Sequence, residues 1–134
     1  MKYPATFTQE AAGITVTFRD IPEAITQGDD EADAIFIAED VLLAAMEVYF
    51  DEKRQVPAPS AAQAGDRLIP LPASIAVKVL LLNEMLSQAV IPSELARRMN
   101  TTRQEVNRLI DLTHTTRINR IEDAMSALGR ELEL

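Results

Sequence analysis

The residues best suited to chemistry lie in PSELARRMNTTRQEVNRLIDL, at residues 92–112. Arginine can donate paired hydrogen bonds to guanine, and glutamine or asparagine can pair with adenine in the same way. If a helix begins after Thr102, side chains of these types fall on its outward face. They are Arg103, Gln104, Asn107 and Arg108, followed by Asp111. This arrangement favours recognition of base edges in a DNA major groove, with Thr102 at the start of the helix.

The spacing of the same segment is that of a helix-turn-helix. Thr102 and Glu105 form a capping-box pattern, in which each side chain covers the backbone amide of the other. Asn100 stands at the turn, where a residue tolerant of the left-handed conformation is needed, and Ala96 provides the small side chain for close helix contact. The residues expected to point inward are Leu95, Met99, Val106, Leu109 and Ile110.

Residues 97–120 also carry six arginines against two acidic residues, a local charge of +4. We expect Arg97 and Arg98, on the first helix of the motif, to contact phosphates without reading sequence. A charged, solvated face is ordinary for any helix, and a helix-turn-helix that binds only protein is the alternative. The capping pattern, the turn residue and the local charge together favour DNA.

Charge is divided unequally along the chain. Residues 1–70 hold 13 acidic and 5 basic side chains, whereas residues 71–134 hold 8 of each, so the net charge of −8 lies entirely in the first part. Such asymmetry is typical of an acidic module joined to one that binds a polyanion. We therefore expect two functional parts.

Turn and strand patterns divide the chain in the same way. Residues 2–8 and 14–19 predict two strands joined near Gly13, and a helix follows from about Glu31 to Glu52, capped by Asp29 or Asp30. Prolines between residues 57 and 72 predict a linker, within which residues 66–71 could return as a strand. The expected α+β organisation is an acidic domain at 1–56, a linker at 57–72 and an all-α domain at 73–134.

The long helix is apolar on more than one side. Asp33, Asp40, Glu47 and Asp51 share one strip, opposite an apolar face of Ile35, Ala38, Leu42, Ala45, Met46 and Tyr49. Ile37, Val41 and Val48 lie beside the acidic strip. These three either face a partner or are covered by the linker.

Composition excludes several chemistries. The chain has no cysteine and one histidine, His114, so thiolate chemistry and histidine metal cages are absent, and we expect no metal and no cofactor. Asp20, Asp29, Asp30 and Asp33 could hold two divalent metals in a nuclease, but the last three are more simply the acidic start of a helix, so we expect no enzyme. We expect His114 in a surface loop near phosphate. With no long apolar run, the protein is expected in the cytosol without a membrane partner.

Two resemblances extend this interpretation. LARRMNTTRQEVNRL resembles the Cro/repressor helix-turn-helix, with Asn100 where glycine is usual. Over about 130 residues the chain is similar to HicB antitoxins. The colinear segments are Tyr3-Pro4, FRDIPEA at 18–24, TQGD at 26–29, IPLP at 69–72 and KVLLLN at 78–83.

The resemblance implies a degenerate ribonuclease-H-like αβ domain of three to four strands and a helix, followed by the helix-turn-helix domain. It implies an antitoxin that inhibits a small mRNA-cleaving HicA-like toxin and represses its own operon as a homodimer or homotetramer bound to operator DNA. The acidic domain agrees with a basic toxin. The expected toxin contacts are Asp20, Glu23, Ile37, Val41 and Val48. The alternative function is a ligand-sensing helix-turn-helix repressor without a toxin partner.

Overall fold

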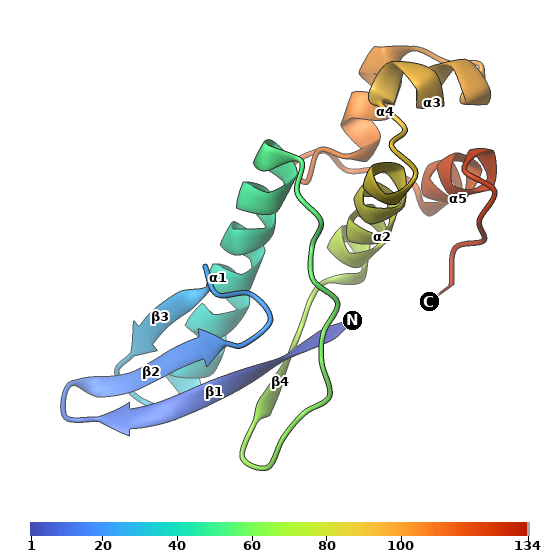
Figure 1. Ribbon diagram of the computed structural model, residues 1–134. Coiled ribbons are helices and arrows are strands. Elements are labelled where there is room, and N and C mark those ends of the chain that lie inside the picture. The colour runs from blue at the N-terminus through green and yellow to red at the C-terminus, as the bar shows by residue number, and fades with distance from the viewer. Residues whose placement is uncertain (134) are drawn as a thin grey trace. The chain divides into compact units, whose positions relative to one another are not determined.

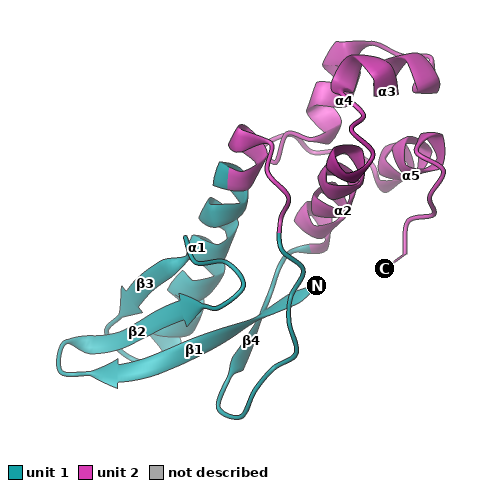
Figure 2. Ribbon diagram, in the orientation of Figure 1, with its two compact units in different colours: residues 1–48, 57–72 teal, residues 49–56, 73–134 magenta. Residues whose placement is uncertain are grey.

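The computed structural model describes residues 1–133, which form an α+β chain with four strands and five helices (Figure 1). The chain divides into two compact units (Figure 2). The first unit comprises residues 1–48 and 57–72, and the second comprises residues 49–56 and the chain from Ala73 onward. This division differs from the expected one, because residues 57–72 belong to the first unit and residues 49–56 to the second.

The first unit is built on an antiparallel sheet in the order β3-β2-β1-β4. Its strands are β1 (Lys2–Glu10), β2 (Gly13–Phe18), β3 (Ile25–Gly28) and β4 (Arg67–Pro70). Glu10 pairs with Gly13, so the turn of the first hairpin is Ala11–Ala12. Gly13 has a φ of +142°, and a Cβ there would lie 2.4 Å from the carbonyl oxygen of Gly28. A glycine is therefore required by the close approach of β3.

The segment at 57–72 is tied to the sheet. β4 pairs with β1 from Lys2 opposite Pro70 to Ala5 opposite Arg67, which confirms a returning strand. The hydroxyl of Tyr3 donates a 2.7 Å hydrogen bond to the carbonyl oxygen of Pro57. These bonds explain why the proline-rich segment belongs to the first unit although its sequence resembles a linker.

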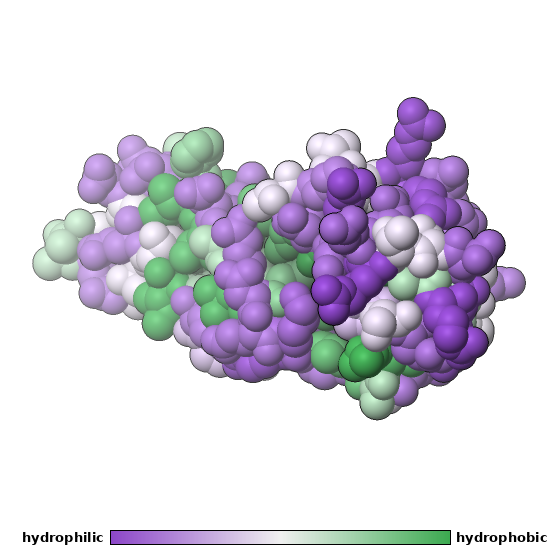
Figure 3. Space-filling model, turned by 90° about the horizontal axis from the view of Figure 1, so that it is seen from above, coloured by the Kyte–Doolittle hydropathy of each residue, from purple (hydrophilic) through white to green (hydrophobic). Residues whose placement is uncertain are grey.

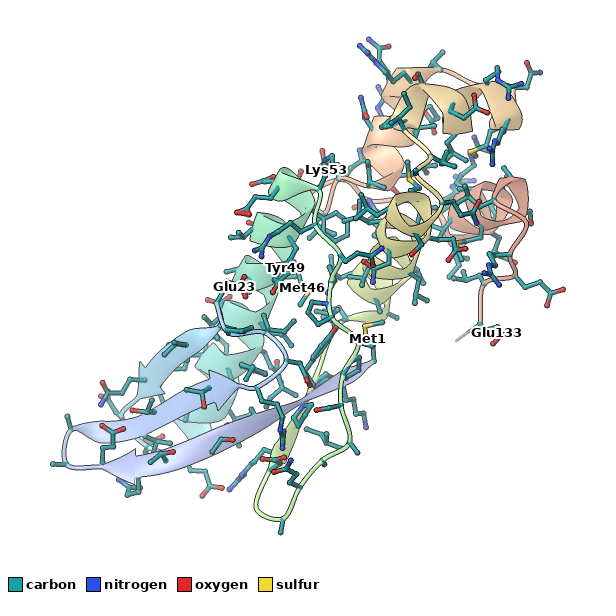
Figure 4. The ribbon with its side chains drawn as sticks, viewed as in Figure 1. Met1, Glu23, Met46, Tyr49, Lys53 and Glu133 are labelled. Atoms are coloured by element: carbon teal, nitrogen blue, oxygen red, sulfur yellow. The ribbon has the colours of Figure 1, made fainter. Side chains whose placement is uncertain are left out.

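Helix α1 (Glu31–Glu52) has the predicted bounds and covers one face of the sheet (Figure 1). Asp30 caps it, because its Oδ1 accepts the Asp33 amide at 2.8 Å. The fully buried residues facing the sheet are Ala34, Ala38, Leu42 and Met46. Ile35, expected on this face, is only half-buried. The helix ends at Glu52, and the next residue, Lys53, adopts a left-handed φ of +53° (Figure 4).

The second unit contains α2 (Ala73–Ser87), α3 (Pro92–Met99), α4 (Arg103–Leu109) and α5 (Ile118–Ala127). Its core includes Leu81 and Leu82 of α2 with Ile121 of α5. The alternation of acidic and apolar residues at 131–134 predicts a short strand, but residues 131–133 take no regular structure, and Leu134 lies outside the described residues. Within residues 1–133, no single helix has the length and apolar character to cross a membrane. Among these residues, α2 and α3 meet both criteria only when taken together, across a 104° bend.

Candidate nucleic-acid interface

The turn between α3 and α4 depends on Asn100. This residue adopts the left-handed conformation, with φ 55° and ψ 47°. Its amide donates to the carbonyl oxygen of Arg97 at 3.2 Å, and the Thr101 amide donates to that of Ala96 at 2.9 Å. The predicted role of Asn100 is confirmed, since these bonds satisfy carbonyls at the end of α3 that have no helical partner.

Thr102 starts α4. Its hydroxyl oxygen accepts the Glu105 amide at 3.1 Å, which confirms one half of the predicted capping box. The other half is not formed as predicted, because the Glu105 carboxylate lies 3.4 Å from Arg108 Nη1 instead. One cap is enough to fix where the helix begins, and the position of its first exposed residues follows from that start.

The faces of α3 and α4 agree with the expected pattern. Leu95, Ala96, Val106 and Leu109 are buried, and Met99 is half-buried. The predicted DNA-contacting residues of α4 are exposed: Thr102, Arg103, Gln104, Asn107 and Arg108. Within residues 1–133, the side chains of Arg103, Gln104 and Asn107 have no hydrogen-bond partner. Their donors and acceptors therefore remain available to a ligand.

Arg97 and Arg98 share one carboxylate. Glu94 accepts hydrogen bonds from Arg97 Nε at 2.9 Å and from Arg98 Nε at 3.1 Å. These bonds hold the pKa of Glu94 at about 2, so its negative charge is present at neutral pH. Glu94 lies just before residues 97–120, and including it lowers the local charge from +4 to +3. The positive charge of α3 is consequently lower than the sequence count suggested.

Sequence reasoning also missed the role of Lys78. This lysine of α2 is 3% exposed, and its ammonium group donates to the carbonyl oxygens of Arg108, Asp111 and His114 at 3.1, 2.6 and 2.6 Å. Burial lowers the pKa of Lys78, and the charge of Asp111 partly opposes that effect. One side chain thus fixes the end of α4 and the loop behind it. The available signal was a lone cation within the apolar run IAVKVLLL.

The loop after α4 is folded by its own side chains. Asp111 accepts hydrogen bonds from the Thr113 amide at 2.9 Å and the Thr113 hydroxyl at 2.7 Å, and these bonds lower its pKa. His114 is exposed in this loop, as expected. Asp111 is therefore engaged within the loop, rather than continuing the exposed row of α4.

The first unit carries the excess charge, with eleven acidic and three basic side chains. Of the expected toxin contacts, Glu23 and Val48 are exposed, whereas Ile37 and Val41 are half-buried. Asp20 accepts two 2.9 Å hydrogen bonds from the amide and hydroxyl of Ser60, which anchor the 57–66 loop. The structure therefore gives Asp20 a structural role in holding this loop.

Three of the four carboxylates considered for metal binding, Asp20, Asp30 and Asp33, accept hydrogen bonds within the first unit. Asp30 caps α1, and Asp33 Oδ2 accepts the Asp29 amide at 2.9 Å. Within residues 1–133, no three histidine or acidic side chains form a group that could hold a metal ion. Asp29, Asp30 and Asp33 form the acidic, capped start of α1.

Comparison with known proteins defines the class as antitoxins of bacterial toxin-antitoxin systems. Residues 2–80 match the family described as HicB_like antitoxin of bacterial toxin-antitoxin system. Antitoxin HicB 2 of Photorhabdus laumondii is 45% identical over 134 residues, covering all of this chain and 95% of that protein. Antitoxin HicB of Escherichia coli K12 is 44% identical over 135 residues, covering all of this chain and 98% of that protein, and antitoxin HicB of Pseudomonas fluorescens is 34% identical over 134 residues, covering 99% and 92%. The chain belongs to the HicB-like antitoxin family.

Proposed function

We propose that this protein binds and inhibits a small, basic, mRNA-cleaving toxin of the HicA kind, and that it represses its own operon by binding operator DNA. The observation that carries the DNA-binding part is the exposed row of Arg103, Gln104 and Asn107, whose polar groups have no partner within the described residues. Family membership supports the toxin-binding part. Both partners belong to the cytosol, where the protein acts.

In this proposal α3 and α4 form a helix-turn-helix. α4 is the recognition helix, with Arg103, Gln104, Asn107 and Arg108 facing base edges and Thr102 near the backbone. Arg97 and Arg98 face phosphates, where Glu94 reduces their attraction. Lys78 holds the far end of α4 in place.

The first unit is the toxin-binding part, a degenerate ribonuclease-H-like domain without catalysis. A protein that grips RNA must present basic groups, and a unit of charge −8 offers it a complementary potential. The same charge repels DNA phosphates, which assigns operator binding to the second unit.

We propose that two or four copies assemble through the second unit. A symmetric dimer would place two α4 helices one DNA turn apart, about 34 Å, and so match a palindromic operator. Light scattering at micromolar concentration should give a mass above that of one chain. A monomer under those conditions would reject the proposal.

The functional test uses the full chain. It should bind DNA from upstream of its own gene more tightly than random DNA, and it should bind the HicA-type toxin encoded beside it and restore growth to cells that express that toxin. A protein that represses its operon in response to a metabolite, yet neither binds nor neutralises the toxin, would instead be a sensing repressor.

A further inference from the structure

The outward strip of α1 is not simply acidic. Acidic and apolar residues alternate along it at spacings of three and four, in the order Asp33, Phe36, Asp40, Leu43, Glu47. Residues spaced in this way lie on one face of a helix. The strip that the sequence marks as a solvated charged face therefore also carries two large apolar side chains.

Phe36 and Leu43 line a groove at the edge of the first unit. The groove has a volume of about 300 Å³, and its other lining residues are Glu39, Asp40, Pro70 and Pro72. Its walls come from α1 and from the end of β4. Phe36 is 71% exposed, and it is one of only four phenylalanines in the chain. The face seen in Figure 3 is mostly hydrophilic, with apolar patches between the hydrophilic residues.

The charges at this groove have one sign. Glu39 and Asp40 are exposed, and within residues 1–133 neither carboxylate pairs with a cation. An apolar surface rimmed by polar groups is typical of a protein interaction site. A second copy of this chain would bring like charges together at the groove, which is unfavourable. Charge complementarity therefore points to a basic occupant.

We propose that the groove formed by Phe36, Leu43, Pro70 and Pro72, with Glu39 and Asp40 at its rim, is the docking site for a basic protein. This inference rests on the proposed function, which makes that protein the HicA-type toxin. An apolar side chain of the toxin packs against Phe36 and Leu43, and a flanking lysine or arginine pairs with Glu39 and Asp40. The contact surface is thus the outward strip of α1, rather than the side that carries Ile37 and Val41.

The test compares full-length variants in their binding to the purified HicA-type toxin made catalytically inactive. Phe36→Ser should weaken binding about 30-fold or more, as expected for an exposed aromatic anchor of an interface. Asp40→Asn should slow association several-fold at low salt with a smaller effect on dissociation. The matched control is Ile25→Ser, because Ile25 is 61% exposed on β3 of the same unit but does not line the groove.

The outcomes separate this inference from the proposed function. If wild-type protein binds the toxin and Phe36→Ser binds it equally well, the groove assignment is overturned while the proposed function stands. If wild-type protein does not bind the toxin, the proposed function itself fails. A change in oligomeric state without a change in toxin affinity would make the groove a contact between copies and also overturn the assignment. An unchanged circular-dichroism spectrum and thermal unfolding midpoint of Phe36→Ser confirm that the variant is folded.

Discussion

Gln104 and Arg103 differ from Arg97 in what surrounds them. Both α4 side chains are exposed without a described partner, whereas Arg97 is already bonded to Glu94. Gln104→Ala should therefore relax discrimination at one operator position by about 1–3 kcal/mol, and Arg103→Ala should do the same at another. Titrations with operator and single-base variants measure this. Equal losses on specific and random DNA would contradict a base-reading role.

Glu94 provides a second test at the level of single residues. Glu94→Gln leaves Arg97 and Arg98 without a neutralising carboxylate, so binding to random DNA should strengthen. The slope of log affinity against log salt should steepen by up to about one released counterion. Because the pKa of Glu94 is about 2, its charge is constant at ordinary pH, and the ratio of wild-type to variant affinity should stay constant from pH 5 to 8. Salt titrations at three pH values check both points. A ratio that changes across this range would contradict the ionised state of Glu94.

Sequence reasoning succeeded for residues whose partners are close in the chain. Thr102 and Asn100 act on amides and carbonyls within four positions, so their residue types already indicate their roles. Lys78 acts on carbonyls 30 to 36 positions away, and such long-range contacts are not encoded in a local pattern. Phe36 was missed because it falls on the acidic strip of α1, where the helical period predicts a solvated face.

At the level of elements, the conformation of Asn100 makes a prediction about the turn. Asn100→Gly should stabilise the protein slightly, by a few tenths of a kcal/mol, because glycine adopts a φ of +55° without a Cβ. Asn100→Val should destabilise it by about 1–2 kcal/mol, because a branched side chain is strained in that conformation. Thermal unfolding of the two variants measures the difference. Equal stabilities would show that the turn adopts another conformation in solution.

The anchoring of α4 by Lys78 can be tested by removing the ammonium group. Lys78→Met leaves three carbonyls without their donor and should lower the free energy of unfolding by about 3 kcal/mol. It should also weaken operator binding, because the end of α4 is released. Lys53→Met is the matched control, since among the described residues Lys53 Nζ bonds one carbonyl, that of Phe50 at 3.0 Å. Chemical denaturation of both variants should separate them, and similar losses would refute the anchoring role.

The direction of the pKa shift of Lys78 fixes how its contribution to stability changes with pH. Burial lowers the pKa of Lys78 in the folded chain below its ordinary value of 10.5. At pH values between the folded pKa and 10.5, the unfolded chain therefore binds a proton more readily than the folded chain. The contribution of Lys78 to stability should therefore rise as the pH increases through that range. Denaturation of wild type and Lys78→Met at rising alkaline pH tests this. A stability difference that narrows with increasing pH would have the wrong sign.

The elements were predictable to different degrees. The bounds of α1 were predicted at both ends, because a cap and a long apolar period mark them. The returning strand β4 was a weaker expectation, since four residues carry little pattern and pairing with β1 stabilises it. The sequence could not predict that residues 49–56 belong to the second unit, because this depends on long-range bonds such as that from the Val56 amide to Asn83 Oδ1 at 2.8 Å.

At the level of the whole molecule, charge is separated between the two units. The first unit carries −8, and the second has equal numbers of acidic and basic groups. A chain of net charge −8 can bind DNA under the proposed function only if its positive groups are concentrated locally, as they are around α4. The unequal distribution of charge along the sequence was therefore informative, whereas a net charge of −8 taken alone would argue against DNA.

This separation predicts how toxin binding by the full chain responds to salt. Attraction between the acidic unit and a basic toxin acts over roughly a Debye length, about 10 Å at 0.1 M salt, so the association rate should fall as salt rises. Apolar contact at Phe36 and Leu43 is insensitive to such screening, so the dissociation rate should change little. Stopped-flow association and dissociation from 50 mM to 500 mM salt measure the two rates. Asp40→Asn should flatten the association curve while Phe36→Ser raises the dissociation rate at every salt concentration. If dissociation accelerates steeply with salt while association stays constant, ion pairs rather than apolar contacts hold the complex together.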